Sequence, residues 1–111
     1  MHYQLKLKMD EKTKEKVESV INSEKIFVMM KGTPEQPMCG FSARVVHVLN
    51  ELDVKFSTFN IFEDPELMQQ IKEYSDWPTT PQIYVEGKLI GGCDILEQLA
   101  ESGKLKETLK I

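Results

Sequence analysis

Apolar residues follow two kinds of spacing along the chain, and each kind predicts one type of element. A spacing of three to four residues is typical of a helix with one buried face, whereas short unbroken apolar or β-branched runs are typical of strands. The helical spacing predicts helices over 11–22, over 39–52, from residue 64 onward, over 94–101 and in a last turn at 105–109. Strand-like runs occupy 25–31, 56–62, 82–85 and 88–90.

The residues between these runs are ones that begin or end regular structure. Asp64, Pro65 and Glu66 are typical of a helix start, because Asp caps the end, Pro fits the first position and an acid complements the dipole. The pair at 86–87 predicts the turn of a hairpin, and Gly103 predicts a helix end. The predicted order is helix, strand, helix, strand, helix, strand, strand, helix, with a final helical turn.

This order predicts an α/β fold. A strand–helix–strand crossover gives a parallel pair of strands, and the hairpin adds antiparallel strands. The economical arrangement is a four-stranded mixed sheet flanked by helices on both faces. A chain of 111 residues suits one domain, residues 1–111, of which 1–10 are expected to form a mobile N-terminal extension.

Charge and composition exclude several classes of protein. The chain has 14 basic and 18 acidic residues, and no basic cluster on a helix face, so nucleic acid is not an expected partner. No apolar run approaches the roughly 18–20 residues that span a bilayer, so no membrane is expected. Residues 1–16 lack the features of a secretion signal or transit peptide. A cytoplasmic location is therefore expected, with an organelle matrix as the alternative if a presequence has been removed.

Cys39 is the first of the two cysteines, which lie far apart in the chain. It follows a strand and a loop with two prolines and stands where a helix begins, so unpaired N–H groups and the positive end of the dipole favour the thiolate. Lys31, at the end of the strand, adds positive charge. A small buried cysteine is the alternative, but the polar setting favours a reactive one.

Ser42 stands three residues after Cys39, where redox enzymes of this topology commonly have a second cysteine. A serine cannot resolve a mixed disulfide. Cys39 is therefore expected to be glutathionylated or to ligate a metal, and not to run a dithiol cycle. The chain has too few Cys and His residues for a zinc site of its own.

Two further segments carry candidate chemistry. Thr80 precedes Pro81 and so favours extended backbone; with a cis bond it would present its N–H and C=O to a peptide ligand beside Cys39, whereas an ordinary turn is the alternative. Gly91 and Gly92 allow a ligand to approach the backbone closely, and the N–H groups that open the next helix can hold a carboxylate.

Asp94 and Cys93 stand at the start of that next helix. Asp94 is expected to bind an ammonium group and can cap the helix at the same time. Cys93 is predicted to be a packing residue and not a second catalyst.

Four motifs in this order resemble those of the CGFS-type monothiol glutaredoxins: Lys31-Gly-Thr-Pro, Met38-Cys-Gly-Phe-Ser42, Trp77-Pro-Thr-Thr-Pro81 and Gly91-Gly-Cys-Asp94. The similarity covers nearly the whole chain from about Val17 onward. It implies a thioredoxin fold in a single-domain member and a glutathione site. It also makes Cys39 the catalytic residue, beside the glutathione sulfur.

The resemblance assigns the remaining glutathione ligands residue by residue. Lys31 would face the glycine carboxylate, and Phe41 would shape the pocket. Thr80 would pair with the backbone of the tripeptide. The N–H of Cys93 together with Asp94 would hold the γ-glutamyl end.

Met68 stands where many relatives carry an arginine that binds the glycine carboxylate, and Gln69 is the candidate substitute. The other possibilities are that glutathione binds less tightly or that Lys31 makes a larger contribution to binding this carboxylate.

The family also binds a [2Fe–2S] cluster between two subunits. Four thiolates hold such a cluster, and Cys39 plus one glutathione from each subunit supply them. The resemblance thus implies a homodimer with the cluster and a monomer without it, and BolA-type and apo iron–sulfur proteins as partners.

The leading hypothesis is therefore a carrier that transfers its cluster to acceptor proteins in iron–sulfur cluster assembly. A glutathione-dependent oxidoreductase that reduces disulfides or removes glutathione from proteins is the alternative, because one thiol suffices if free glutathione resolves the intermediate. Any such activity is expected to be weak. A redox-inert binding module is the third possibility, and retention of all the motif elements argues against it.

Overall fold

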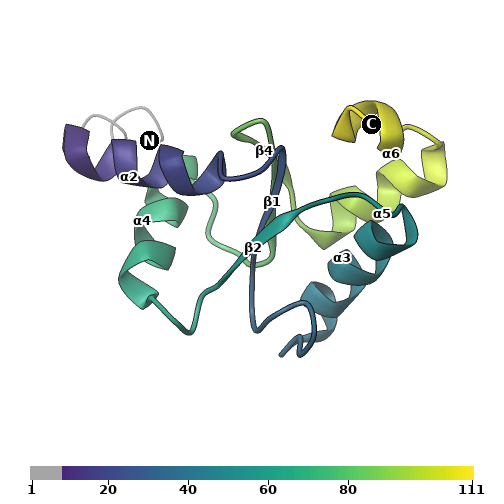
Figure 1. Ribbon diagram of the computed structural model, residues 1–111, viewed down its shortest axis with the longest axis horizontal. Helices are drawn as coiled ribbons and strands as arrows, with labels where there is room; N and C mark the ends of the chain where they lie inside the picture. Colours follow the sequence, from purple (N-terminus) through teal and green to yellow (C-terminus); the bar gives the residue numbers. More distant parts are fainter. Residues whose placement is uncertain (1–8) are drawn as a thin grey trace.

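A four-stranded mixed sheet runs through the middle of the protein, in a computed structural model that describes residues 9–111 (Figure 1). The strands are β1 (Ile26–Met30), β2 (Ser57–Asn60), β3 (Gln82–Val85) and β4 (Lys88–Gly91). Their order is β2-β1-β3-β4, with β1 and β2 parallel and the other pairs antiparallel. The predicted α/β sheet, with its crossover and hairpin, is confirmed.

Helices cover both faces of this sheet (Figure 1). One layer contains α3 (Gly40–Glu51), α5 (Cys93–Ser102) and α6 (Leu105–Leu109), and the other contains α2 (Glu11–Ile21) and α4 (Pro65–Ser75). Because side chains alternate along a strand, Val28 of β1 packs in the first layer and Phe27 in the second. All five residues of β1 are buried, which explains its unbroken apolar sequence.

Side-chain caps place the starts of three helices. Asp10 accepts a hydrogen bond from the N–H of Thr13 at 2.7 Å and begins α2, and Asp64 accepts one from the N–H of Leu67 at 3.0 Å and begins α4. The third cap is Cys39. Of the extension predicted at residues 1–10, residues 1–8 lie outside the described residues, and Asp10 belongs to the α2 cap.

Strand β2 is shorter than the predicted run at 56–62. The N–H of Glu63 donates to the carbonyl oxygen of Asn60 at 3.0 Å and closes a turn directly after β2. The side-chain oxygen of Asn60 also accepts hydrogen bonds from the N–H of Gly32 at 3.0 Å and from that of Phe62 at 3.1 Å. Phe62 is consequently exposed. The same side chain ties the loop after β1 to the end of β2, so Asn60 helps to fix the segment that leads to Cys39.

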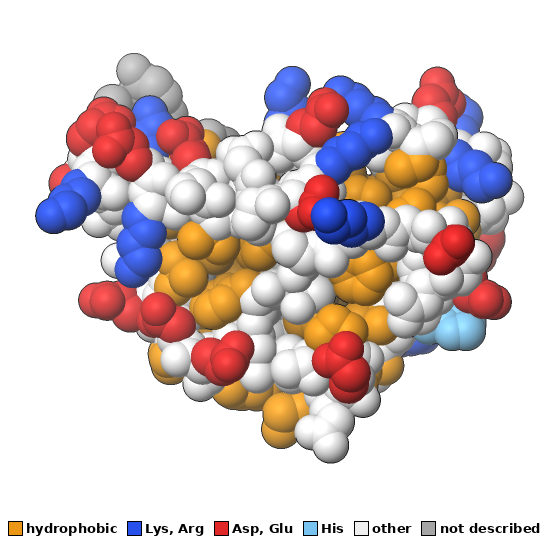
Figure 2. Space-filling model, viewed as in Figure 1, with side chains coloured by type: hydrophobic (Ala, Val, Ile, Leu, Met, Phe, Trp, Pro, Cys, Tyr) orange, Lys and Arg blue, Asp and Glu red, His pale blue; other side chains and the backbone are white. Residues whose placement is uncertain are grey.

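The surface carries both signs of charge. On the face shown in Figure 2, acidic and basic side chains are mixed between patches of apolar side chains. No helix in the described part of the chain combines the length and the apolar character needed to cross a membrane.

Candidate functional site

Cys39 is the N-cap of α3, and its sulfur replaces the oxygen that usually caps a helix. The thiol is half-buried, and Sγ accepts a hydrogen bond from the N–H of Ser42 at 3.3 Å. Burial alone would raise the pKa of Cys39. The hydrogen bonds from Ser42 and Phe41 and the charge of Lys31 outweigh burial and hold this pKa below its ordinary value. The predicted activation at the helix start therefore has a concrete geometry.

The Ser42 hydroxyl completes the surroundings of the sulfur. Its side chain is fully buried, and Oγ lies 3.4 Å from Sγ of Cys39. Oγ also accepts a hydrogen bond from the N–H of Lys31 at 3.1 Å. Because that bond uses an oxygen lone pair, the hydroxyl proton is available to the Cys39 thiolate. The sequence showed only that Ser42 is no second thiol, whereas the structure shows a stabilising contact.

Ser42→Ala is expected to raise the pKa of Cys39, because it removes a hydrogen bond that favours the thiolate. Alkylation by iodoacetamide should slow roughly two- to tenfold at pH 7, the worth of one such bond, and the rate profile should move to higher pH. Ser102→Ala, the same change at the end of α5, should leave the profile unchanged. An unshifted profile for Ser42→Ala would show that its hydroxyl does not stabilise the sulfur.

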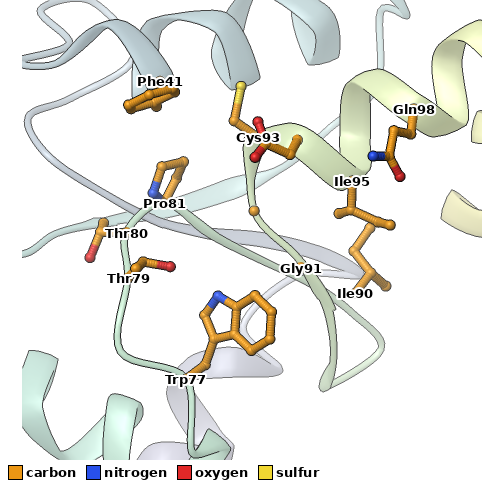
Figure 3. Close-up of a pocket in the computed structure, with 12 residues that line it drawn as sticks. Phe41, Trp77, Thr79, Thr80, Pro81, Ile90, Gly91, Cys93, Ile95 and Gln98 are labelled. Atoms are coloured by element: carbon orange, nitrogen blue, oxygen red, sulfur yellow. The ribbon is translucent and has the colours of Figure 1, made fainter.

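A pocket of about 510 Å³ opens between the start of α3, the loop at 77–81 and the turn from β4 into α5. Figure 3 shows Phe41 and Pro81 at one end, Trp77 across from them, and Ile90 and Ile95 along one side. The bond between Thr80 and Pro81 is cis. The full lining is Phe41, Trp77, Thr79, Thr80, Pro81, Ile90, Gly91, Gly92, Cys93, Asp94, Ile95 and Gln98.

The start of α5 contributes unpartnered backbone donors to this pocket. Gly92 is the N-cap and makes no side-chain cap bond. The helix begins at Cys93, so Asp94 lies inside its first turn and the prediction that Asp94 caps the helix is wrong. The N–H groups of a first helical turn have no partner within the helix. They are therefore available to an anion in the pocket.

The comparisons with known proteins decide the family. The glutaredoxin family model matches residues 26–90, more than half of the chain. The chain belongs to the glutaredoxin family. The "Probable monothiol glutaredoxin 2" of Rickettsia felis is 48% identical over 101 residues, which cover 91% of this chain and 97% of that protein. Mitochondrial monothiol glutaredoxin-5 of Saccharomyces cerevisiae is 42% identical over 113 residues, 99% of this chain and 75% of that one.

A solved structure gives the same answer for the fold. Reduced apo GrxS14 of poplar is 44% identical, with a TM-score of 0.76 over 87% of this chain and 89% of that one. The chain is therefore a monothiol glutaredoxin, and the thioredoxin fold implied by the resemblance is confirmed.

The structure brings most of the predicted site residues of this glutaredoxin to one place. Phe41, Thr80 and the pair Cys93 and Asp94 line the pocket. Cys39 lies two residues before Phe41 at the tip of α3 but is not part of the lining. The charge of Lys31 acts on the Cys39 sulfur.

Gln69 is not among these residues. It is exposed and lines a second hollow of about 490 Å³, which shares only Trp77 with the first. Met68, at the position where many relatives have arginine, packs against the core under α2 and α4. The structure thus places neither side chain in the pocket of about 510 Å³ between α3 and α5, which is called the main pocket below.

Cys93 contributes its backbone to the pocket and its sulfur to the core. The residue is buried among apolar side chains of the α3 and α5 layer, and its sulfur points away from Trp77 (Figure 3). Burial and the charge of Glu97 raise the pKa of the Cys93 thiol. Both cysteines are free thiols, with opposite shifts in pKa.

Sequence reasoning missed the apolar side of the pocket. Ile90 and Ile95 fall within the strand predicted at 88–90 and the helix predicted at 94–101 and were not candidate site residues, but both line the pocket. Gly91 makes this possible, since its φ is +138° and a Cβ there would lie 2.4 Å from the Cγ2 of Ile95. In the sequence, Gly91 and Gly92 indicated only that a ligand could approach the backbone closely. Nothing in the sequence indicated that Gly91 lies against the side chain of Ile95.

Proposed function

We propose that this glutaredoxin binds glutathione in the main pocket and that Cys39, together with glutathione, ligates a [2Fe–2S] cluster shared by two subunits. The protein carries this cluster and transfers it to acceptor proteins in iron–sulfur cluster assembly. The observation that carries the proposal is the Cys39 thiol, whose lowered pKa favours a thiolate beside a pocket and whose neighbour Ser42 is not a second cysteine.

The size of the pocket and the polar groups at its edge support glutathione as the ligand. Its volume of about 510 Å³ lies within the roughly 300–1,000 Å³ of small-molecule sites. The γ-glutamyl carboxylate fits the open N–H groups at Cys93, and its ammonium group fits the carboxylate of Asp94. Thr80, which precedes the cis bond to Pro81 and lines the pocket with Phe41, is expected to offer its backbone N–H and C=O to the tripeptide.

Lys31 is the residue we assign to the glycine carboxylate. It follows β1 and its charge reaches the Cys39 sulfur, which glutathione must approach. Gln69, the substitute predicted from the sequence, lines the hollow beyond Trp77. Met68 is partly buried against the core. Lys31 is therefore the only one of the assigned residues that supplies positive charge for the glycine carboxylate.

Counting of ligands leads to a dimer. Four thiolates hold a [2Fe–2S] cluster, and among residues 9–111 no group of three or more His, Cys, Asp or Glu side chains is placed to hold a metal ion. Cys39 and one glutathione supply two thiolates, so two subunits complete the set. We therefore expect a homodimer with the cluster and a monomer without it. Ligation that is partly non-protein and accessible to solvent makes the cluster labile, as a carrier needs.

The family implies BolA-type proteins and apo iron–sulfur proteins as partners. A cytoplasmic location stays a prediction, since the yeast relative is named mitochondrial and the Rickettsia felis relative is bacterial.

Anaerobic reconstitution with iron, sulfide and glutathione tests the proposal. We expect a brown dimer with visible absorption, and a large loss of colour when glutathione is left out. The alternative is a glutathione-dependent oxidoreductase. Its Cys39 thiolate would attack the mixed disulfide of a glutathionylated protein, take over the glutathione and release the protein thiol. A second glutathione would then displace Cys39 and leave as oxidised glutathione. A colourless monomer that rapidly reduces such a mixed disulfide would favour this alternative.

Asp94→Asn is expected to weaken glutathione binding roughly ten- to hundredfold, because a hydrogen bond to a charged group contributes about 1.5–3 kcal/mol. Isothermal titration calorimetry measures the dissociation constant. Glu101→Gln removes the same charge from the other end of α5, outside the pocket lining, and should leave the constant unchanged. Equal effects of the two variants would argue against a direct contact with Asp94.

A further inference from the structure

Two polar side chains in the described part of the chain are buried, and both lie next to the site. Ser42 contacts the Cys39 sulfur, as described above. Gln82, the first residue of β3, has no exposed surface. Burying an amide costs free energy unless its donors and acceptor are all hydrogen-bonded. The partners of Gln82 therefore show what its burial maintains.

The amide group of Gln82 binds the backbone of the pocket wall. Nε2 donates to the carbonyl oxygen of Trp77 at 2.7 Å and to that of Thr79 at 3.1 Å. Two facing carbonyl oxygens settle which end of the amide carries the hydrogens, because only the NH₂ group can donate to both. Both Trp77 and Thr79 line the pocket.

The acceptor end of the same amide is also occupied. The hydroxyl of Tyr84, two residues along β3 on the same face, donates to Oε1 of Gln82 at 2.6 Å. Since this bond uses the only hydroxyl proton of Tyr84, the hydroxyl of Ser75 must be the donor in its own hydrogen bond with Tyr84. A directed chain of hydrogen bonds thus runs from the end of α4 through β3 to the loop at 77–79.

This loop has little else to hold its shape. Pro78 and Pro81 lack an N–H and cannot donate backbone hydrogen bonds. Within the described residues, the carbonyl groups of Trp77 and Thr79 receive hydrogen bonds only from Gln82. The N–H of Trp77 bonds to Lys72 and fixes the start of the loop to α4, but not its pocket side.

We propose that Gln82 is a positioning residue for the ligand pocket, which holds Trp77 and Thr79 in place so that Thr80 meets the ligand backbone. Tyr84 and Ser75 orient the amide. The inference rests on the proposed glutathione site for its effect on binding, but its effect on the loop does not depend on any ligand.

Gln82→Met tests this inference, because methionine keeps the length of the side chain and loses all three hydrogen bonds. The dissociation constant for glutathione, measured by calorimetry, should rise roughly five- to tenfold. Trp77 is the only tryptophan of the chain, so tryptophan fluorescence reports on this loop alone. Quenching of Trp77 by acrylamide in the absence of ligand should become stronger. Tyr84→Phe, which removes one hydroxyl, should change both quantities in the same direction by a smaller factor.

Ile21→Val is the matched control for a general loss of stability. Ile21 is fully buried in α2, in the same core as Tyr84, and has no bond to the loop. This variant should melt at a lower temperature with unchanged Trp77 quenching. Equal quenching in Ile21→Val and Gln82→Met would overturn the inference, as would an unchanged Trp77 signal in Gln82→Met.

If Gln82→Met does not fold, the same comparison between Tyr84→Phe and Ile21→Val decides. Failure of the wild-type protein to bind glutathione would overturn the proposed function, and Trp77 quenching would still decide the inference.

Discussion

Cys39→Ser is expected to abolish cluster binding, with loss of the visible absorption, of bound iron and sulfide, and of the cluster-dependent dimer. Cys39 lies at the tip of α3, where the hydrogen bonds from Ser42 and Phe41 and the charge of Lys31 outweigh burial and lower the pKa of its thiol. A serine hydroxyl does not ionise near neutral pH and is a poor ligand for iron in a cluster that takes thiolates. Absorption spectra, metal analysis and size-exclusion chromatography after anaerobic reconstitution measure the loss.

Cys93→Ser is the control, because it makes the same change at the other cysteine. The Cys93 sulfur is buried in the core, and its pKa is raised, so it is not expected to serve as a ligand. This variant should keep the colour and the dimer, with a lower melting temperature from the changed core. A coloured Cys39→Ser protein and a colourless Cys93→Ser protein would show that Cys93, and not Cys39, ligates the cluster, and would contradict the proposed function.

The elements of the fold could be predicted because their signals are local. Asp64 and Pro65 mark the start of α4, and Gly103 ends α5 with a φ of +76°, a conformation that favours glycine. The end of β2 had no such signal. A turn closed by the bond from the N–H of Glu63 to the carbonyl oxygen of Asn60 follows it, and the Asn60 side chain binds Gly32, a residue 28 positions earlier in the chain. Contacts of this kind exist only after the sheet has formed.

The site was predictable where one residue acts alone at an element's end. Cys39 at the start of α3 and the open N-terminus of α5 both follow from where helices begin. The support of the site was not predictable. In the sequence, Gln82 looks like an ordinary residue at the start of a strand. Only the folded chain shows that its amide faces two carbonyl groups of the preceding loop.

The choice between neighbours on one helix also needed the structure. Met68 and Gln69 are adjacent in α4, and a difference of one residue turns a helical side chain by about 100°. Met68 consequently packs against the core and is partly buried, and Gln69 lines the hollow beyond Trp77. The resemblance to relatives with an arginine at this point made Gln69 a candidate ligand and could not distinguish the directions of the two side chains.

Gly32→Ala is expected to destabilise the protein and to impair Cys39 at the same time. Gly32 has a φ of +90°, and an added Cβ would lie 2.4 Å from the carbonyl oxygen of Gln36 and 2.8 Å from the N of Met38, both of them backbone atoms. Left-handed backbone costs other residues about 1–3 kcal/mol, and the backbone must also move. We expect a loss of about 3 kcal/mol in the free energy of unfolding and a fall of roughly 10–20 °C in melting temperature.

Gly103→Ala separates the two parts of this cost. Gly103 has a φ of +76° with no atom within 4 Å of an added Cβ, and it lies at the end of α5. Strain alone should cost about 1 kcal/mol there, with normal alkylation of Cys39. In Gly32→Ala the loop that closes through the bond from Met38 to Lys31 must shift, and Cys39 follows it directly. Alkylation of Cys39, measured well below the melting temperature, should therefore slow in Gly32→Ala alone. Equal stability and equal alkylation rates in the two glycine variants would show that the loop absorbs the added methyl group without moving Cys39.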